Sequence, residues 1–381
     1  MIYLDYNATT PVAEGVLEEM LPAFTADFGN PSNTSHAPGR RASRLVDVAR
    51  ERVGTVLQAN PGRVIFTSGS TEALNLAIKG LTLPPGRNRF LIGATEHKAV
   101  LEAAAARTDV TAELLPVRGD GTLDLDALED ALADDVALVA YMAVNNETGV
   151  IHPIAKVQAR AASVGAMTLC DATQAVGRIA LDDVAKADLV ALSAHKIYGP
   201  KGVGCLVGSR EGLRALNPVV SGGGQERGLR SGTLNVPGIV GLGAAVALVT
   251  ADLDIESERQ RQLRDLLQSQ IQERLGDVHL NGHPELRVCN TLNLRFEGAD
   301  GEAILTNLRQ VAASAGSACQ SAVPVASHVL RAMGLTAVEA DRSLRFSLGR
   351  PTTAKEIEAA VDDVVSAVTR VRELESESGE A

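Results

Sequence analysis

Short apolar runs alternate with helical patterns from about residue 63 to about residue 208. Apolar runs bounded by turn residues are typical of buried strands. Because the strands alternate with helices, the pattern predicts βαβ units and an α/β fold, with a mostly parallel sheet flanked by helices. The predicted strands are Arg63–Thr67, Phe90–Gly93, Ala137–Val144, Thr168–Cys170, Asp188–Leu192 and Cys205–Val207.

The pattern changes at about residue 257. A long polar helix is expected over Ser257–Leu275, and fewer strands follow it. The later part of the chain therefore predicts a smaller α+β domain. Its expected strands are Thr291–Arg295 and Ser343–Ser347, and its expected helices are Gly301–Arg309 and Ala354–Val371.

Length and charge narrow the class of protein. A chain of 381 residues exceeds the usual size of one core, so two domains are expected. A net charge of −11 argues against nucleic acid and against an anionic membrane surface as partners. The start of the chain has no signal-peptide pattern, and the apolar segment Val236–Val249 is too short to span a bilayer. We therefore interpret this segment as a buried helix and expect a cytoplasmic protein.

Lys196 is the first candidate for chemistry. It follows the predicted strand Asp188–Leu192, and a lysine at a strand end in a pocket can form a Schiff base with an aldehyde. Ser193 and His195 beside it are small or cationic donors suited to a phosphate. Together they indicate pyridoxal 5'-phosphate, an aldehyde that carries a phosphate. The alternative is a strand-end lysine that faces solvent.

Two other predicted strands also end in polar residues. Ser70 and Thr71 stand at a Ser/Gly/Thr turn that enters a helical pattern, where backbone N–H groups and the helix dipole favour an anion. Asp171 can pair with a protonated pyridine nitrogen, and Gln174 can reach the phenolic oxygen of the ring. An ordinary helix cap and a surface salt bridge are the alternatives. Because ligands of such sheets bind beyond the carboxyl ends of strands, these residues can converge.

The pieces, in this order, resemble the class V aminotransferase family of fold-type I pyridoxal-phosphate enzymes, and further motifs narrow the resemblance to the cysteine desulfurases. It extends from the first residues to about Thr353. It implies a large cofactor-binding domain of residues 14–256 and a small domain made of residues 1–13 and 257–381. The narrowing motifs are Tyr3–Thr10, Gly29–Ser32, Thr95–Lys98, Asn145–Gly149, Gly222–Gly228, Arg230–Thr233, Ser314–Cys319 and Leu344–Arg350.

The resemblance also implies roles for single residues. His97 would stack over the cofactor ring and move protons, and Asn146 would hydrogen-bond the cofactor and the substrate. Arg345 would clamp the substrate carboxylate, with Arg350 as the rival. The residues expected to bind the cofactor are Ser70, Thr71, His97, Asn146, Asp171, Gln174, Ser193, His195, Lys196 and Thr233.

The cysteines differ in their surroundings. None forms a C-x-x-C pair, so no metal site is expected. Cys170 and Cys205 are expected to be buried packing residues, and Cys289 is ambiguous. Cys319 lies among Ala, Ser and Gly without apolar periodicity, as in an exposed loop. The resemblance implies that its thiolate takes the sulfur of L-cysteine as a persulfide, releases L-alanine and passes the sulfur to an acceptor protein for iron–sulfur or other sulfur-cofactor synthesis.

Thr233 carries the expectation of quaternary structure. In relatives this turn reaches the phosphate site of the neighbouring subunit, which implies a homodimer with shared active sites; the alternative is an intrachain loop. A plain aminotransferase would not need Cys319, and a non-catalytic scaffold would not need Lys196. A lyase that prefers selenocysteine stays open.

Overall fold

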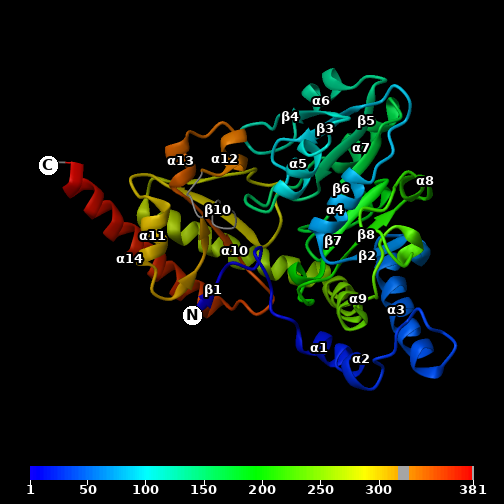
Figure 1. The fold of residues 1–381 in the computed structure, drawn as a ribbon. Coiled ribbons are helices and arrows are strands. Elements are labelled where there is room, and N and C mark those ends of the chain that lie inside the picture. The colour runs from blue at the N-terminus through cyan, green and yellow to red at the C-terminus, as the bar shows by residue number, and fades with distance from the viewer. Residues whose placement is uncertain (316–325, 380–381) are drawn as a thin grey trace.

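A seven-stranded sheet forms the centre of the larger lobe in the computed structural model, which describes residues 1–315 and 326–379 (Figure 1). The strand order is β2-β8-β7-β6-β5-β3-β4, and only β8 runs antiparallel to its neighbours in this sheet. The predicted mostly parallel α/β fold is therefore confirmed. The strands are β2 (Val64–Thr67), β3 (Arg89–Gly93), β4 (Thr111–Leu115), β5 (Val136–Met142), β6 (Met167–Asp171), β7 (Leu189–Ser193) and β8 (Gly204–Gly208).

Helices cover both faces of this sheet. Successive strand residues alternate between two apolar clusters, so that Val190 packs on one face and Leu189 on the other. Burial on both faces explains why the strands are continuous apolar runs. The helices of this lobe are α1 (Glu14–Met20), α2 (Pro22–Thr25), α3 (Ala37–Val56), α4 (Ser70–Lys79), α5 (Lys98–Ala105), α6 (Leu125–Ala131), α7 (Ile154–Ser163), α8 (Arg210–Arg214) and α9 (Val236–Ala251).

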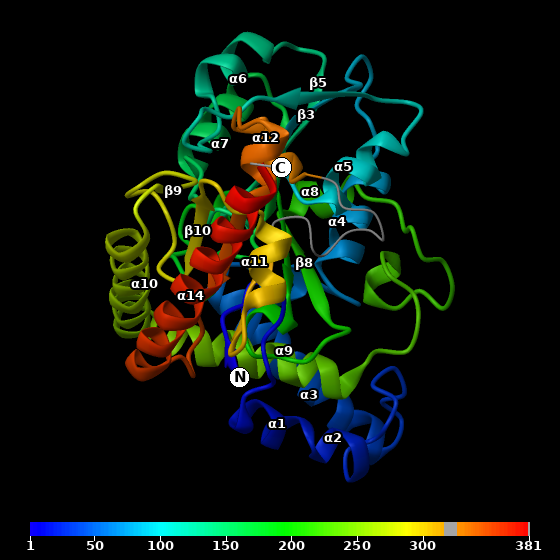
Figure 2. The same ribbon diagram turned by 90° about the vertical axis from the view of Figure 1, so that its left-hand side faces the viewer.

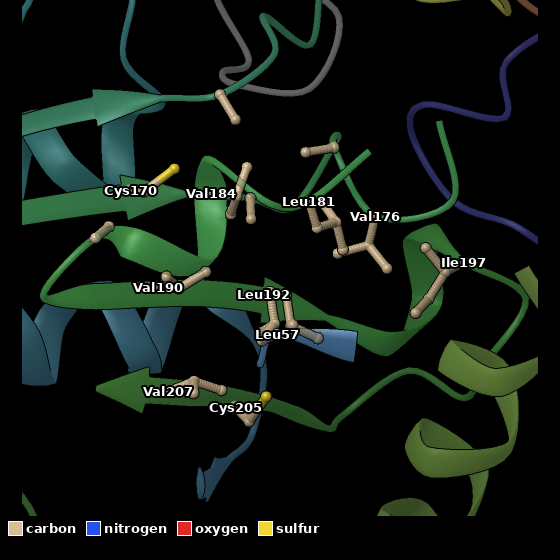
Figure 3. Close-up of a cluster of buried hydrophobic side chains, with 14 of the residues drawn as sticks. Leu57, Cys170, Val176, Leu181, Val184, Val190, Leu192, Ile197, Cys205 and Val207 are labelled. Atoms are coloured by element: carbon tan, nitrogen blue, oxygen red, sulfur yellow. The ribbon is translucent and has the colours of Figure 1, made fainter. Parts of the chain in front are cut away.

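Two cysteines belong to the core of this lobe. Cys170 and Cys205 lie among apolar side chains such as Val190 and Leu192 (Figure 3), and both are fully buried. Their predicted role as packing residues is confirmed. The ambiguous Cys289 is also a buried, free thiol, and burial raises its pKa.

The smaller lobe contains a four-stranded antiparallel sheet in the order β12-β13-β10-β9. Its core is separate from the cores of the large sheet and includes residues of α10 and α14. The predicted α+β character of this part is therefore confirmed. Its elements are β9 (Val278–Leu280), β10 (Thr291–Phe296), β11 (Val311–Ala312), β12 (Ser314–Ala315), β13 (Ser343–Ser347), α10 (Leu253–Leu275), α11 (Gly301–Asn307), α12 (His328–Ala332), α13 (Ala337–Asp341) and α14 (Ala354–Gly379).

The N-terminus joins this smaller lobe. Strand β1 (Ile2–Tyr3) pairs in parallel with β11 (Figure 1), and Ile2 and Leu4 belong to the smaller core. These contacts support the proposed division into residues 14–256 and residues 1–13 with 257–381.

The apolar segment after residue 235 forms α9, which is almost entirely buried and packs closely on α3. Within the described residues, no single helix is long and apolar enough to cross a membrane, and only α9 and α10 together pass such a test, with a bend of 74° between them.

Candidate active site

A pocket of about 160 Å³ lies where several strands of the large sheet end and the smaller lobe meets them. Strand β6 supplies Asp171 at its last residue, and β7 is followed directly by the short helical turn Ala194–Lys196. From the smaller lobe, β13 supplies Arg345. The polar residues that line the pocket are Asn7, Ser70, Thr71, His97, Asn146, Asp171, Thr173, Gln174, His195, Lys196 and Arg345. Nine of the predicted site residues therefore share one pocket.

Lys196 is held by the N-terminal segment of the chain. Its Nζ donates to the backbone carbonyl oxygens of Asn7 and Ala8, both at 2.7 Å. Arg178 links Lys196 to the same N-terminal segment, because it donates to the carbonyl of Lys196 and to Asn7 Oδ1. The amine of Lys196 is thus positioned by contacts to residues about 190 positions earlier in the chain.

Asp171 and its neighbours form one wall of the pocket. Asp171 Oδ1 accepts a hydrogen bond from the backbone N–H of Thr173 at 2.9 Å, which fixes the carboxylate at the strand end. Gln174 Nε2 donates to the carbonyl of Asn7 at 3.1 Å. Gln174 Oε1 and Thr173 Oγ1 are buried and have no hydrogen-bond partner among the described residues. A buried polar atom without a partner is costly, so both atoms are candidates for contact with a polar ligand.

Ser70 and Thr71 begin helix α4, whose N-cap makes no side-chain hydrogen bond among the described residues. An adjoining cavity runs over this helix start and is lined by Ser70, Thr71, Ser193 and His195. Ser193 lines this cavity and not the pocket around Lys196. Backbone N–H groups at a helix start favour an anion, so the cavity is suited to a phosphate group.

His195 differs from the sequence-based expectation of a cationic donor. Burial, together with the charges of Lys196 and Lys201, lowers the pKa of His195 to about 4. The imidazole is therefore neutral at pH 7. Its Nδ1 lies 3.1 Å from Thr9 Oγ1, and its backbone carbonyl accepts from Thr10.

His97 is also neutral. It caps α5, because its Nδ1 accepts a hydrogen bond from the backbone N–H of Ala99 at 3.0 Å. Burial lowers its pKa, the Asp171 charge opposes this effect, and Lys196 adds to it. Because Nδ1 accepts from Ala99, the neutral ring carries its proton on Nε2 and can donate it.

Glu96, next to His97, is a buried carboxyl that sequence reasoning passed over. One oxygen accepts from the backbone N–H of Met142, and the other has no hydrogen-bond partner among the described residues. Burial and the nearby charge of Asp171 raise its pKa well above the ordinary range. Burial therefore favours the neutral acid form of the Glu96 side chain.

Arg345 is largely buried and already paired. Its Nη2 lies 2.6 Å from Asp5 Oδ1, and its Nη1 donates to the carbonyl of Asn146 at 3.0 Å. The rival, Arg350, lies outside this pocket and forms an ion pair with Asp252. Of the two arginines, only Arg345 faces the pocket.

Among the described residues, Ser193 and Thr233 are the predicted site residues that do not line this pocket. Thr233 is exposed and lines a separate cavity that includes Arg230. Cys319 lies outside the described residues.

Asn7 and Ala8 are the main residues that single-residue reasoning missed. Asn7 also donates from Nδ2 to the carbonyl of Asn146 and to Thr291 Oγ1. The segment from Tyr3 to Thr10 is recognisable as a motif in the sequence. A motif of residue types does not show that the backbone carbonyls of Asn7 and Ala8 have a role.

The fold and the lysine at the strand end define a class of protein: the fold is that of NifS-like pyridoxal-phosphate enzymes. Residues 2–360 match the family described as aminotransferase class-V, and the chain belongs to this family.

Individual relatives agree with this family. The chain is 50% identical to a protein of Frankia sp. (strain EuIK1) named cysteine desulfurase, with 98% of this chain and 93% of the relative covered. It is 45% identical to the cysteine desulfurase IscS of Anaeromyxobacter sp. (strain Fw109-5), with coverage of 98% and 94%. A solved structure described as a NifS-like protein is 33% identical and has a TM-score of 0.89, with 97% of this chain and 99% of that chain covered. The structure of SspA in complex with cysteine is 34% identical and has a TM-score of 0.80, with coverage of 91% and 99%.

Proposed function

We propose that this chain, a cysteine desulfurase by its family and relatives, uses pyridoxal 5'-phosphate on Lys196 and a persulfide on Cys319. In the overall reaction the C–S bond of L-cysteine breaks and an S–S bond to Cys319 forms. The carbon skeleton leaves as L-alanine, so atoms and electrons balance without another reactant. The observation that carries the proposal is the convergence of Lys196, Asp171 and His97 in one pocket.

The residues of the pocket suit the proposed cofactor. Asp171 would hold a protonated ring nitrogen, and the unpaired Gln174 Oε1 and Thr173 Oγ1 are available to polar groups of the ring. Ser70, together with the start of α4, would hold the phosphate. When bound, the cofactor supplies an electron sink next to the substrate α-carbon.

Proton movements fall to Lys196 and His97. When the substrate amine replaces Lys196 on the cofactor, the released amine of Lys196 would act as a base. The carbonyls of Asn7 and Ala8 would position this amine in the pocket. His97 is neutral at pH 7 because burial lowers its pKa. Its Nδ1 accepts from Ala99, so Nε2 carries the ring proton and is the atom that can donate it.

Arg345 is the proposed partner of the substrate carboxylate. Its fork already contacts Asp5 and the carbonyl of Asn146. A substrate carboxylate must therefore share the guanidinium with Asp5. This sharing limits the strength with which Arg345 binds the substrate carboxylate.

A homodimer with shared sites is part of the proposal. Two observations support it. Large apolar side chains are exposed on and after helices α1 and α2, namely Leu17 (45% exposed), Leu21 (54%), Phe24 (58%) and Phe28 (71%). Exposed apolar side chains in number are typical of an interaction surface. Thr233 is also exposed, so it is free to reach a neighbouring subunit.

Sulfur would pass from Cys319 to an acceptor protein for iron–sulfur cluster assembly or another sulfur cofactor. Cytoplasmic location is proposed with it. The three cysteines of the described residues are free thiols, as is usual in reducing compartments.

Cysteine variants test the chemistry. Cys319→Ser should bind pyridoxal phosphate and still bind L-cysteine, but it should neither gain a persulfide nor release alanine at the normal rate. Cys289→Ala is the matched control, because Cys289 is buried and its pKa is raised by burial. Mass spectrometry of the protein and an alanine assay measure the two products. Loss of activity in Cys289→Ala with full activity in Cys319→Ser would transfer the role to Cys289.

A subunit-mixing experiment tests the shared site. Thr233→Asp should lose activity because it sets a carboxylate against the phosphate. Dissociation and reassociation with inactive Lys196→Ala should yield mixed dimers with one site free of both changes. Recovered activity supports sharing, and no recovery in demonstrated mixed dimers contradicts it.

A further inference from the structure

A second pocket, of about 490 Å³, lies in the smaller lobe between helix α10 and the loop that follows β9. Figure 2 shows α10 at the left-hand edge of the molecule, apart from the large sheet. We name it the arginine pocket, because Arg261, Arg264 and Arg287 line it. None of these residues lines the pocket around Lys196.

Two of these arginines are nearly buried. The side chains of Arg264 and Arg287 are only 5% and 6% exposed. Arg264 Nη1 donates to the carbonyl of Val288 at 2.6 Å, and Arg287 Nη2 donates to Gln268 Oε1 at 2.7 Å. Arg287 Nη1 is buried and has no hydrogen-bond partner among the described residues. Because Nε of Arg287 donates to the carbonyl of Pro284 at 3.2 Å, Nη1 is the nitrogen of this guanidinium that lacks an acceptor in the described part of the chain. A buried cation with an unmatched donor favours an anion.

The nearby carboxylates are unevenly placed with respect to the three arginines. Among the described residues, Asp265 is the carboxylate paired with all three, at 2.7 Å from Arg264, 3.3 Å from Arg261 and 3.6 Å from Arg287. Arg261 has a second partner in Glu258. Glu285 also lines the pocket but is exposed, and no ion pair joins it to these arginines among the described residues.

The electrostatics of Arg287 agree with this imbalance. Burial and the charge of Arg264 lower the pKa of Arg287 to about 10. The guanidinium remains charged at pH 7, but the surroundings disfavour its charge. An anion placed between Arg264 and Arg287 would offset both effects, because it favours the charged form of Arg287.

We propose that the arginine pocket is a binding site for a carboxylate, supplied by a free polycarboxylate or by an acidic side chain of a partner protein. A planar carboxylate matches the fork of a guanidinium in two parallel hydrogen bonds. Asp265 does not use this geometry, because its single atom Oδ1 accepts from both Nε and Nη2 of Arg264. The bound carboxylate would take the position toward Arg287, and the proposal does not rest on the proposed desulfurase activity.

The test is titration calorimetry of the full chain with citrate and with a hexaglutamate peptide, at low ionic strength. Citrate binding indicates the free source, and peptide binding without citrate binding indicates the side-chain source. Arg287→Gln should weaken binding by roughly tenfold to a hundredfold, the range for a hydrogen bond to a charged group. Raised salt should weaken it further.

Two further variants protect the test from a folding artefact. Ser269→Glu adds a carboxylate at an exposed position of the pocket lining, so it should reduce binding in a chain that folds normally. Arg274→Gln is the matched control, because Arg274 lies on the same helix, 44% exposed, in an ion pair with Asp362. It should bind citrate or peptide as the parent chain does.

Several results would overturn the proposal. These are no binding of either probe at millimolar concentration, equal loss of binding in Arg274→Gln, or full binding in both Arg287→Gln and Ser269→Glu. Tighter binding of inorganic phosphate than of citrate would overturn the assignment to carboxylate.

Discussion

Arg345 in the active-site pocket and Arg287 in the arginine pocket are equally buried but differently paired. Arg345 has the carboxylate of Asp5 at 2.6 Å and is 5% exposed. Arg287 is 6% exposed, and its nearest carboxylate oxygen, of Asp265, lies 3.6 Å away and is shared. One guanidinium is neutralised within the chain, whereas the other is left for a ligand.

The difference teaches how burial prepares a cation for a task. A paired arginine costs less to bury and can exchange its partner during a reaction. An arginine without a close carboxylate is costly to bury, and a bound anion would offset this cost. The active site thus favours turnover, and the arginine pocket favours occupancy.

The largest effect is expected for Lys196→Ala. Removing the proposed base and proposed attachment point of the cofactor should lower alanine formation by about 10²–10⁴-fold or more. The visible absorption band that forms with added pyridoxal phosphate should also disappear. Lys186→Ala, at an exposed lysine paired with Asp183, is the control. Citrate binding should survive in Lys196→Ala, and its loss would show that the two pockets are not independent.

A smaller effect is expected for Arg345→Gln. Loss of a charge-assisted contact to the substrate carboxylate should raise KM for L-cysteine by roughly tenfold to a hundredfold. The value of kcat should change less. Steady-state kinetics measure both constants. If Arg350→Gln raised KM instead, the role would pass to Arg350, in spite of its ion pair with Asp252.

Asp265→Asn tests the comparison between Arg345 and Arg287 in the arginine pocket. Without this carboxylate the three arginines have no shared internal partner. Citrate should bind up to about fivefold more tightly, the size of a partly exposed ion pair. Calorimetry at two salt concentrations measures the change. Weaker binding would mean that Asp265 orients the arginines more than it competes with the ligand.

The smallest expected effect is a change in the pKa of His97. Burial lowers the pKa of His97 below its ordinary value of 6.5, and the charge of Lys196 lowers it further. In Lys196→Ala, NMR should therefore find the pKa of His97 raised relative to the parent chain. An unchanged or lower value would contradict the electrostatic coupling between the two residues.

The same lowered pKa has a consequence for stability. The unfolded chain binds a proton at His97 at a higher pH than the folded chain does. The contribution of His97 to the free energy of unfolding is therefore complete above about pH 6.5 and decreases as the pH falls toward the folded pKa. Urea unfolding of the parent chain and of His97→Gln, measured across this range, isolates the contribution.

Much of the fold could be predicted because local pattern and tertiary structure agree. Strand β13 has the predicted bounds Ser343–Ser347, and β7 differs from the prediction by one residue at each end. Strand β4, Thr111–Leu115, was missed because it is an edge strand with mostly exposed side chains. An apolar run cannot reveal a strand that is not buried.

The candidate site divides in the same way. Lys196 and Asp171 are recognisable because both follow apolar strands. The carbonyls that hold Lys196 are not recognisable, because a backbone oxygen carries no residue-type signal. The pair of Asp5 with Arg345 joins residues 340 positions apart, and no local pattern encodes such a contact.

The attachment of β1 to β11 also sets the order in which the enzyme matures during synthesis. Ile2 leaves the ribosome well before its partner Val311, which is made 309 residues later. At about 5–20 residues per second, this delay is roughly 15–60 s. The large sheet has all its strands by then, while the carbonyls that aim Lys196 still lack their anchoring strand. The reactive amine is therefore completed last, after nearly the whole chain has been made.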